Sequence, residues 1–167
     1  MINFSIINKM KIVKQTELSK KDKIQIFELW NNEYPEKLVF HTLEDSENYL
    51  DNLTQKTHYL LLNSEGNIEG WAITFIRENE KWFAIIISEK LHGRSLGTMM
   101  INKLKEDEAI LNGWVIDHNT DKKSNGNFYK SPIGFYIKNG FETLNETRLE
   151  LEIMSAVKIK WNKLKCD

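Results

Sequence analysis

The chain has 167 residues, and its 23 lysine and arginine side chains are balanced by 24 aspartate and glutamate side chains, so the formal net charge is -1. This length suits a single domain, and the balanced charge excludes attraction of the whole chain to nucleic acid or to an anionic membrane, although a local basic patch stays open. No stretch approaches about 18 apolar residues in a row, and the polar N-terminal segment is too short for a signal peptide. The one cysteine, Cys166, allows no internal disulfide, so we expect a reducing, cytoplasmic setting.

The N-terminal half of the chain predicts a strand, two helices and then three strands. Ser19, with Asp22 three residues later, is the expected N-cap of the first helix, and Thr42 introduces the second. The turn signal "NSEGN" lies between two strand-like runs, which predicts a hairpin. After an extension at 1–9, the predicted elements are a strand at 10–15, a helix from Ser19 to near Trp30, a helix at 43–52, and strands at 57–62, 68–77 and 81–88.

The run "KWFAIIIS" at 81–88 is apolar on both faces, so we expect this strand in the middle of the sheet. A helix at about 97–112 follows, and Gly113 is predicted to end it. The next apolar run, "WVID" at 114–117, indicates a further buried strand. A strand, a helix and a strand in this order require a parallel pair, because the crossover between the two strands is long.

The C-terminal part predicts one short helix and two strands. Proline suits the first position of a helix, so Ser131 and Pro132 open this helix, and Gly140 closes it. The stretches "RLELEI" and "VKIKW" alternate between apolar and charged residues, which is typical of strands with one solvent-exposed face. Their pairing partners stay open. The element order predicts a mixed α/β sandwich.

The segment "EKLHGRSLGTMM" at 89–100 leads from the central strand into the following helix. The first turn of a helix has backbone N–H groups without partners and carries about half a positive charge. Gly93 and Gly97 let the main chain approach a ligand, and Arg94 adds a donor for a phosphate oxygen. This pattern predicts an anion site, best suited to phosphate, and a plain strand-to-helix turn stays open as the alternative. Neither the Walker motif nor GxGxxG is present, which disfavours a nucleotide.

Two stretches of the chain together resemble the GCN5-related N-acetyltransferases. The residues from His92 to Gly97 are similar to that family's acetyl-CoA-binding motif, although His92 replaces its glutamine or arginine and Ser95 replaces its first glycine. The stretch "FYIKNGF" at 135–141 resembles the fourth-helix signature of the family, a tyrosine shortly before Gly-Phe. The element order also matches, from about residue 10 to residue 154. Tyr129 stands where many members have an asparagine near the pantetheine arm.

The resemblance implies an α/β (α+β) fold with a mixed, mostly antiparallel central sheet, helices on both faces and one strand-helix-strand crossover. It implies a single N-acetyltransferase domain over residues 1–167 that transfers an acetyl group from acetyl-CoA to a primary amine of a small molecule or peptide. The transfer is direct, within a ternary complex. A non-catalytic acetyl-CoA-binding module of the same fold stays open, as does an acyltransferase that uses a longer acyl group.

The resemblance also assigns the binding of acetyl-CoA to particular residues. In the family the third long strand ends in a bulge, and the pantetheine arm lies beside it like an added strand. By position this role falls to the backbone of Ile85, Ile86 and Ile87, with the N–H near Ile87 binding the thioester carbonyl. The pyrophosphate is expected on the turn that follows. The implied residues of this turn are His92, Gly93, Arg94, Ser95, Leu96, Gly97 and Thr98.

Tyr136 is the implied general acid, because a phenol with an ordinary pKa near 10 is protonated at neutral pH and can donate to the departing thiolate. A tyrosine packed in the core is the alternative. Some relatives use a glutamate on the central strand as general base, and this strand has none. Asp117 and His118 at the end of the next strand are the candidates, and a chain of water molecules is the other option.

The acceptor and further partners are less defined by the sequence. Glu33 and His41 are expected in the loop that joins the first two helices, which often covers the acceptor in the family, and plain solvent exposure is the alternative for both. The four histidines are scattered, so no metal site is predicted. A homodimer stays open. Four aromatic side chains either line an acceptor pocket or belong to the core, namely Trp30, Tyr34, Trp71 and Trp82.

Overall fold

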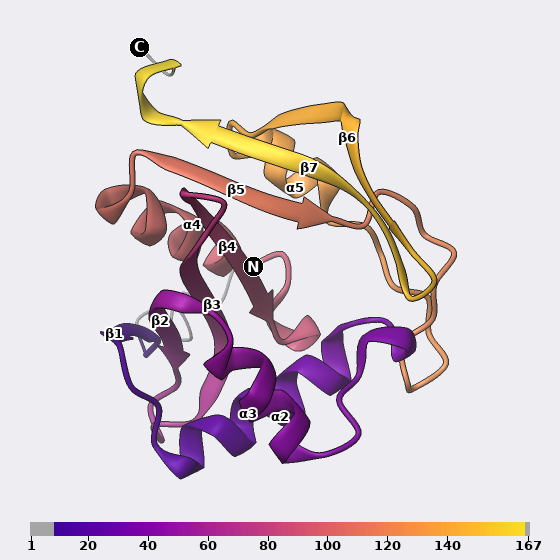
Figure 1. Cartoon of the computed structure of the whole chain (residues 1–167). Helices are drawn as coiled ribbons and strands as arrows, with labels where there is room; N and C mark the ends of the chain where they lie inside the picture. The colour runs from indigo at the N-terminus through magenta and orange to yellow at the C-terminus, as the bar shows by residue number, and fades with distance from the viewer. Residues whose placement is uncertain (1–8, 166–167) are drawn as a thin grey trace.

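The computed structural model describes residues 9–165, so residues 1–8 of the expected extension and Cys166 lie outside the described part. Within that part, seven strands form one sheet in the order β1-β2-β3-β4-β5-β7-β6 (Figure 1). The strands are β1 (Lys11–Gln15), β2 (Thr54–Leu62), β3 (Ile68–Arg77), β4 (Glu80–Ile87), β5 (Ile110–Val115), β6 (Glu142–Leu151) and β7 (Met154–Asn162). The helices are α2 (Lys20–Glu33), α3 (Leu43–Asp51), α4 (Leu96–Asp107) and α5 (Ile133–Lys138), with the short 3-10 helices η1 (Glu36–Leu38), η2 (Glu89–Leu91) and η3 (Lys163–Lys165). None of the helices between residues 9 and 165 is long and apolar enough to cross a membrane.

The predicted helix starts at Ser19 and Thr42 are confirmed. Ser19 accepts a hydrogen bond from the backbone N–H of Asp22 at 3.1 Å, and the Asp22 carboxylate accepts one from the backbone N–H of Ser19 at 3.0 Å. Thr42 and Asp45 form the same reciprocal pair, with both distances 3.1 Å. These bonds satisfy donors that a helix leaves free at its start. Helix α2 runs on to Glu33, one turn beyond the predicted end at Trp30.

The mixed, mostly antiparallel sheet is confirmed, with a single parallel contact between β4 and β5. The expected hairpin is β2 and β3, which pair in antiparallel fashion. The two C-terminal strands, whose partners the sequence left open, form a second hairpin of β6 and β7. Strand β7 also pairs with β5, so this hairpin extends the sheet on the far side of the crossover.

The predicted helix at about 97–112 is wrong in its last third. Helix α4 ends at Asp107, and β5 begins at Ile110, so Gly113 lies inside a strand and ends no helix. A Cβ atom on Gly113 would lie 2.9 Å from a ring carbon of Phe83, which explains the absence of a side chain there. The spacing of Leu104 and Leu111 fits one helical face, but Leu111 reaches the same core from the strand.

The short helix α5 begins one residue later than predicted. Pro132 is its cap residue and Ile133 its first helical residue, and the chain leaves the helix at Gly140 with a φ of 84°. A left-handed residue after the helix end is the usual place for glycine, so the predicted stop at Gly140 is confirmed.

Helices cover both faces of the sheet, as predicted (Figure 1). Residues of α4 and α5 pack with one face around Met100, Leu104 and Phe83. Residues of α2 and α3 pack with the other face. Three of the four aromatic candidates lie in this second core, so the core alternative is confirmed for Trp30, Trp71 and Trp82, while Tyr34 is half-buried at its edge.

Candidate functional site

Strand β4 is fully paired on one side and almost unpaired on the other. Its register with β3 runs without a shift from Arg77 opposite Glu80 to Gly70 opposite Ile87. With β5 it shares only the pair of Trp82 and Asn112, after which the two strands diverge (Figure 1). We call this divergence of β4 and β5 the fork. The fork exists because β5 pairs with β7 along its whole length. The bulge expected at the end of β4 is absent, since the β3–β4 register has no shift.

The pairing of β4 with β3 decides which backbone groups face the fork. The N–H of Ser88 donates to the carbonyl of Glu69 at 2.9 Å, so Ser88 is bonded to β3. Because backbone groups alternate in direction along an antiparallel strand, the N–H and carbonyl of Ile86 also point towards β3. The N–H groups of Ile85 and Ile87 then point into the fork. Of the three predicted isoleucines, only these two present backbone groups on the open edge.

The turn before α4 leaves the start of this helix open. Gly93 has a φ of 75° and Ser95, the cap residue, a φ of 61°. The side chain of Ser95 makes no capping hydrogen bond, and the first helical bond runs from the N–H of Met99 to the carbonyl of Ser95 at 3.0 Å. The N–H groups of Leu96, Gly97 and Thr98 therefore have no partner in the helix. Such a helix start fits the binding of a phosphate group.

His92 and Arg94 have different surroundings in this turn. The Nε2 atom of His92 lies 2.9 Å from the carbonyl oxygen of Ile87, and since a carbonyl only accepts, Nε2 is the donor. The imidazole thus ties the turn back to the end of β4. Arg94 is half-buried and makes no hydrogen bond or ion pair with the residues that the structure describes. Its guanidinium is available to an anion.

Glycine is favoured at positions 93 and 97 of the turn for different structural reasons. Gly93 has no neighbour that a Cβ atom would touch, and its positive φ alone favours glycine. A Cβ atom on Gly97 would lie 3.0 Å from two ring carbons of Phe135. Phe135 belongs to α5, so Gly97 lets α5 pack closely beside the first turn of α4.

Tyr136 lies next to Phe135 on α5 and is buried between aromatic rings. Its ring centre is 5.7 Å from that of Phe83, 5.1 Å from Phe135 and 5.5 Å from Phe141. Burial raises the pKa of its phenol well above the ordinary value, and the nearby phenol of Tyr129 raises that pKa further. The Tyr136 phenol is therefore protonated throughout the neutral range, as a proton donor must be.

No family model matches the sequence, and no curated protein matches it either. Solved structures do match. An aminoglycoside 6'-N-acetyltransferase complexed with coenzyme A is 13% identical, with a TM-score of 0.69 over 92% of this chain and 97% of that one. A spermidine N-acetyltransferase from Vibrio cholerae, in complex with CoA and spermine, is 15% identical, with a TM-score of 0.66 over 95% and 98%. A phosphinothricin acetyltransferase from Sinorhizobium meliloti, in complex with AcCoA, is 10% identical, with a TM-score of 0.64 over 90% and 88%.

The chain has the fold of the GCN5-related N-acetyltransferases. In this N-acetyltransferase fold, the fork and the open start of α4 are neighbours, because η2 and the turn join the end of β4 to α4. The expected fold class is confirmed.

Asp117 and His118, the two candidates for the general base, are both hydrogen-bonded to other residues. The Asp117 carboxylate accepts two hydrogen bonds from Arg148, at 2.9 and 3.0 Å, and this contact lowers its pKa. The Nδ1 atom of His118 accepts from the N–H of Thr120 at 3.3 Å and lies 2.8 Å from the Thr120 hydroxyl. The nitrogen that would take a proton from an amine is therefore occupied.

Two further tyrosines lie near Tyr136 that sequence reasoning did not place there. Burial raises the pKa of Tyr34 well above its ordinary value, and the phenols of Tyr129 and Tyr136 add to this rise. Tyr34 follows α2, and Tyr129 lies in the connection between β5 and α5, so phenols from distant parts of the sequence raise one another's pKa. The sequence signal was the replacement of the family's asparagine by Tyr129.

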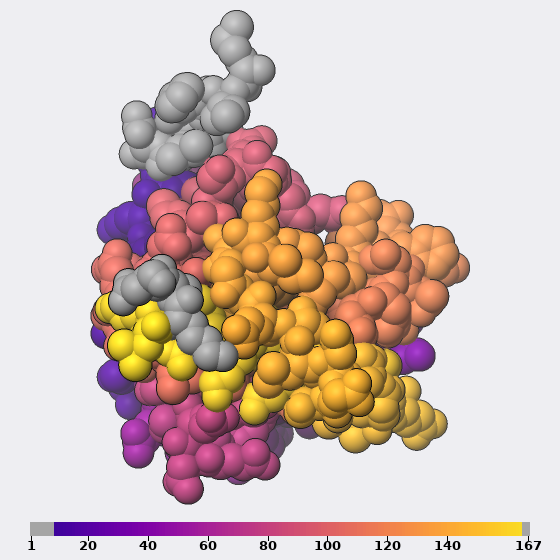
Figure 2. Space-filling view, turned by 90° about the horizontal axis from the view of Figure 1, so that it is seen from above, coloured from indigo at the N-terminus to yellow at the C-terminus, as the bar shows by residue number. Residues whose placement is uncertain are grey.

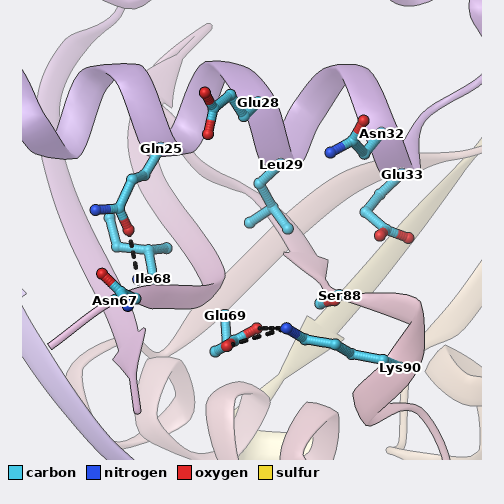
Figure 3. A pocket seen from close by; sticks show the side chains of 10 residues that line it. All are labelled: Gln25, Glu28, Leu29, Asn32, Glu33, Asn67, Ile68, Glu69, Ser88 and Lys90. Carbon is cyan, nitrogen blue, oxygen red and sulfur yellow. Dashed lines mark hydrogen bonds and ion pairs between the residues drawn. The ribbon is translucent and has the colours of Figure 1, made fainter. Parts of the chain in front are cut away.

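A polar groove of about 410 Å³ lies between α2, the start of β3 and the segment that follows β4 (Figure 3). Its lining residues are Gln25, Glu28, Leu29, Asn32, Glu33, Asn67, Ile68, Glu69, Ser88 and Lys90. None of the predicted acetyl-CoA residues lines it, although Ser88 directly follows Ile87. Lys90 and Glu69 form an ion pair of 2.9 Å on its floor. His41 is exposed outside it, and no cluster of three or more metal-binding side chains occurs between residues 9 and 165.

Proposed function

We propose that the protein is an N-acetyltransferase that transfers an acetyl group from acetyl-CoA to a primary amine of a small molecule or peptide. The observation that carries this proposal is the open edge of β4 beside the uncapped start of α4. One feature presents N–H groups for an extended amide chain, and the other presents N–H groups for a phosphate. Pantetheine and pyrophosphate offer these two chemistries in one molecule. The named N-acetyltransferases of the same fold support the proposal.

The backbone of β4 and the turn would hold acetyl-CoA, which supplies the activated acetyl thioester. The N–H groups of Ile85 and Ile87 extend the sheet to the pantetheine amides and the thioester carbonyl. A donor aimed at the developing oxyanion is worth roughly 3–4 kcal/mol in the transition state. The N–H groups of Leu96, Gly97 and Thr98, together with the free guanidinium of Arg94, take the pyrophosphate.

Tyr136 is the proposed proton donor to the departing thiolate. Its raised pKa keeps the phenol protonated, and α5 holds it beside the first turn of α4 through the contact of Phe135 with Gly97. We assign no side chain to proton removal from the amine, because Asp117 and His118 are already hydrogen-bonded. Water takes that role in this proposal.

A second candidate is a non-catalytic acetyl-CoA-binding module with the same fold. The engagement of Asp117 by Arg148 and of His118 by Thr120 favours it, because neither residue is poised as a base. Both candidates share the acetyl-CoA site and differ only in turnover.

Titration calorimetry with acetyl-CoA, followed by an assay of free CoA thiol with a panel of amines, tests both candidates. The panel contains a polyamine, an aminoglycoside, an amino acid and a short peptide. An N-acetyltransferase binds one acetyl-CoA per chain and releases CoA only when an accepted amine is present. Binding without release for any amine supports the module, and a chain that does not bind acetyl-CoA contradicts both candidates.

A further inference from the structure

The connection between β5 and α5 forms a small hairpin that reaches the other side of the fork. The N–H of Tyr129 donates to the carbonyl of Asp121 at 2.8 Å, and the N–H of Lys123 donates to that of Asn127 at 2.9 Å. The N–H of Glu36 donates to the carbonyl of Lys122 at 2.8 Å, so the hairpin at 121–129 is joined to the segment after α2. Figure 2 shows this part of the chain, in salmon to light orange, as a lobe at one side of the molecule.

Lys123 of this hairpin is a lysine with almost no contact with solvent. Its residue is 6% exposed, whereas most lysines lie at the surface. The Nζ atom lies 2.6 Å from a carboxylate oxygen of Glu89 and 3.8 Å from one of Glu33. Burying an ammonium group is costly unless carboxylates compensate its charge, and Glu33 and Glu89 supply these carboxylates.

The Lys123–Glu89 ion pair joins segments that follow the two strands of the fork. Glu89 is the first residue of η2, which follows the end of β4 and leads directly into the turn at 92–98. Lys123 lies in the hairpin at 121–129, in the connection that leaves the end of β5 at Val115. Since β4 and β5 are parallel and diverge towards these ends, the Lys123–Glu89 ion pair joins the segments that follow the two strands at the open end of the fork. Glu33, the last residue of α2, anchors the same lysine from a third direction.

We propose that Lys123 is a positioning residue that sets the width of the fork and the place of the turn for acetyl-CoA. This inference rests on the proposed function, because it assigns the fork to acetyl-CoA. Without the ammonium group between them, the carboxylates of Glu33 and Glu89 repel one another more strongly, which favours a shift of η2 away from α2. The ion pair of Lys37 with Asp121 nearby differs, because the Lys37 side chain is 60% exposed and such pairs contribute little.

The test compares the Kd for acetyl-CoA of the full-length wild type with that of Lys123→Met, by calorimetry at a temperature where both are folded. We expect the Kd to rise about tenfold, within the range of roughly 5- to 150-fold for coupling between separate sites. Lys81→Met is the matched control, because Lys81 forms a half-buried ion pair of 3.2 Å with Glu108 at the closed end of the fork. This control is expected to lower the melting temperature and to leave the Kd within twofold.

Glu89→Gln supplies a second, independent measurement. The Glu89 side chain is 56% exposed, so this variant is expected to fold, and its Kd should rise as for Lys123→Met, with no further rise in the double variant. If Lys123→Met does not fold, the Glu89→Gln result decides alone. A Kd within twofold of wild type in either folded variant, or additive effects in the double variant, overturns the inference while the proposed function stands. A wild type that does not bind acetyl-CoA overturns both.

Discussion

Helices α2 and α3 begin differently from α4. Ser19 and Asp22 close the start of α2 with reciprocal hydrogen bonds, and Thr42 and Asp45 close the start of α3. The start of α4 has no capping side chain, and its cap residue Ser95 is held in the left-handed region. The three starts therefore differ in whether a side chain accepts a hydrogen bond from the first turn of the helix.

Charge separates these helix starts in the same way. The first turn of α2 contains Asp22, and that of α3 contains Glu44 and Asp45, whereas that of α4 contains no acidic residue. The acidic residues compensate the positive end of the helix dipole and would repel an anion. Among the helices of eight or more residues in the described part, α4 alone offers an anion free donors without a competing charge. The start of α4 is therefore the helix start best suited to an anion.

The largest effect that would sharpen the comparison is expected at Tyr136, which follows Phe135, the α5 residue that packs against the first turn of α4. Tyr136→Phe removes one oxygen and should lower turnover by roughly 10²–10⁴-fold, the usual contribution of a general acid. The Kd for acetyl-CoA and the melting temperature should change little. Turnover of CoA per folded molecule and thermal unfolding are measured on one preparation. A turnover within threefold of wild type would show that Tyr136 is a core residue and no acid.

A carboxylate at the cap of α4 should convert this start into one like those of α2 and α3. Ser95→Asp tolerates the left-handed conformation and compensates the helix dipole, so stability should be unchanged or slightly higher. The Kd for acetyl-CoA should rise about 10- to 100-fold by charge repulsion. Ser95→Asn, which has the same shape without charge, is the control. Equal Kd values for the two variants would remove the pyrophosphate from this turn. Gly97 is the poorer probe, since any side chain there meets Phe135.

Removal of the caps of α2 and α3 should affect the fold and spare the ligand. Ser19→Ala and Thr42→Ala each leave a helix donor without its side-chain acceptor, and each should lower the free energy of unfolding by about 1 kcal/mol. The Kd for acetyl-CoA should stay within twofold of wild type. Denaturant unfolding and calorimetry measure the two quantities. A large change in Kd would break the distinction between capped and open helix starts.

The smallest effect is expected from Ser95→Gly. A non-glycine residue in the left-handed region destabilises the folded state by about 1–2 kcal/mol, and glycine removes this strain. The greater freedom of glycine in the unfolded chain offsets about 0.4–1 kcal/mol of that gain in stability. The variant should therefore be more stable by several tenths of a kcal/mol, with unchanged affinity for acetyl-CoA. Unfolding curves of wild type and variant in parallel check this. A loss of affinity would mean that the serine hydroxyl itself contacts the ligand.

Sequence reasoning succeeded where the determining contacts are local. The starts of α2 and α3 rest on bonds between residues three apart, Ser19 with Asp22 and Thr42 with Asp45, and both were predictable. The β2–β3 hairpin and the stop at Gly140 depend likewise on short turns. The prediction failed for Gly113, because it pairs with Ile159 of β7 and lies against Phe83 of β4, both distant in the sequence.

By itself, the sequence determined the order of the elements, the open turn before α4 and the resemblance that links this turn with Tyr136. Only the tertiary structure decided what those residues face. The alternation of Ile85 and Ile87 into the fork depends on the register with β3. The engagement of Asp117 by Arg148 joins positions 31 apart in the chain, and that of Lys123 by Glu89 joins positions 34 apart. Contacts at such separations leave no periodic pattern in the sequence, because the two partners come together only when the chain folds.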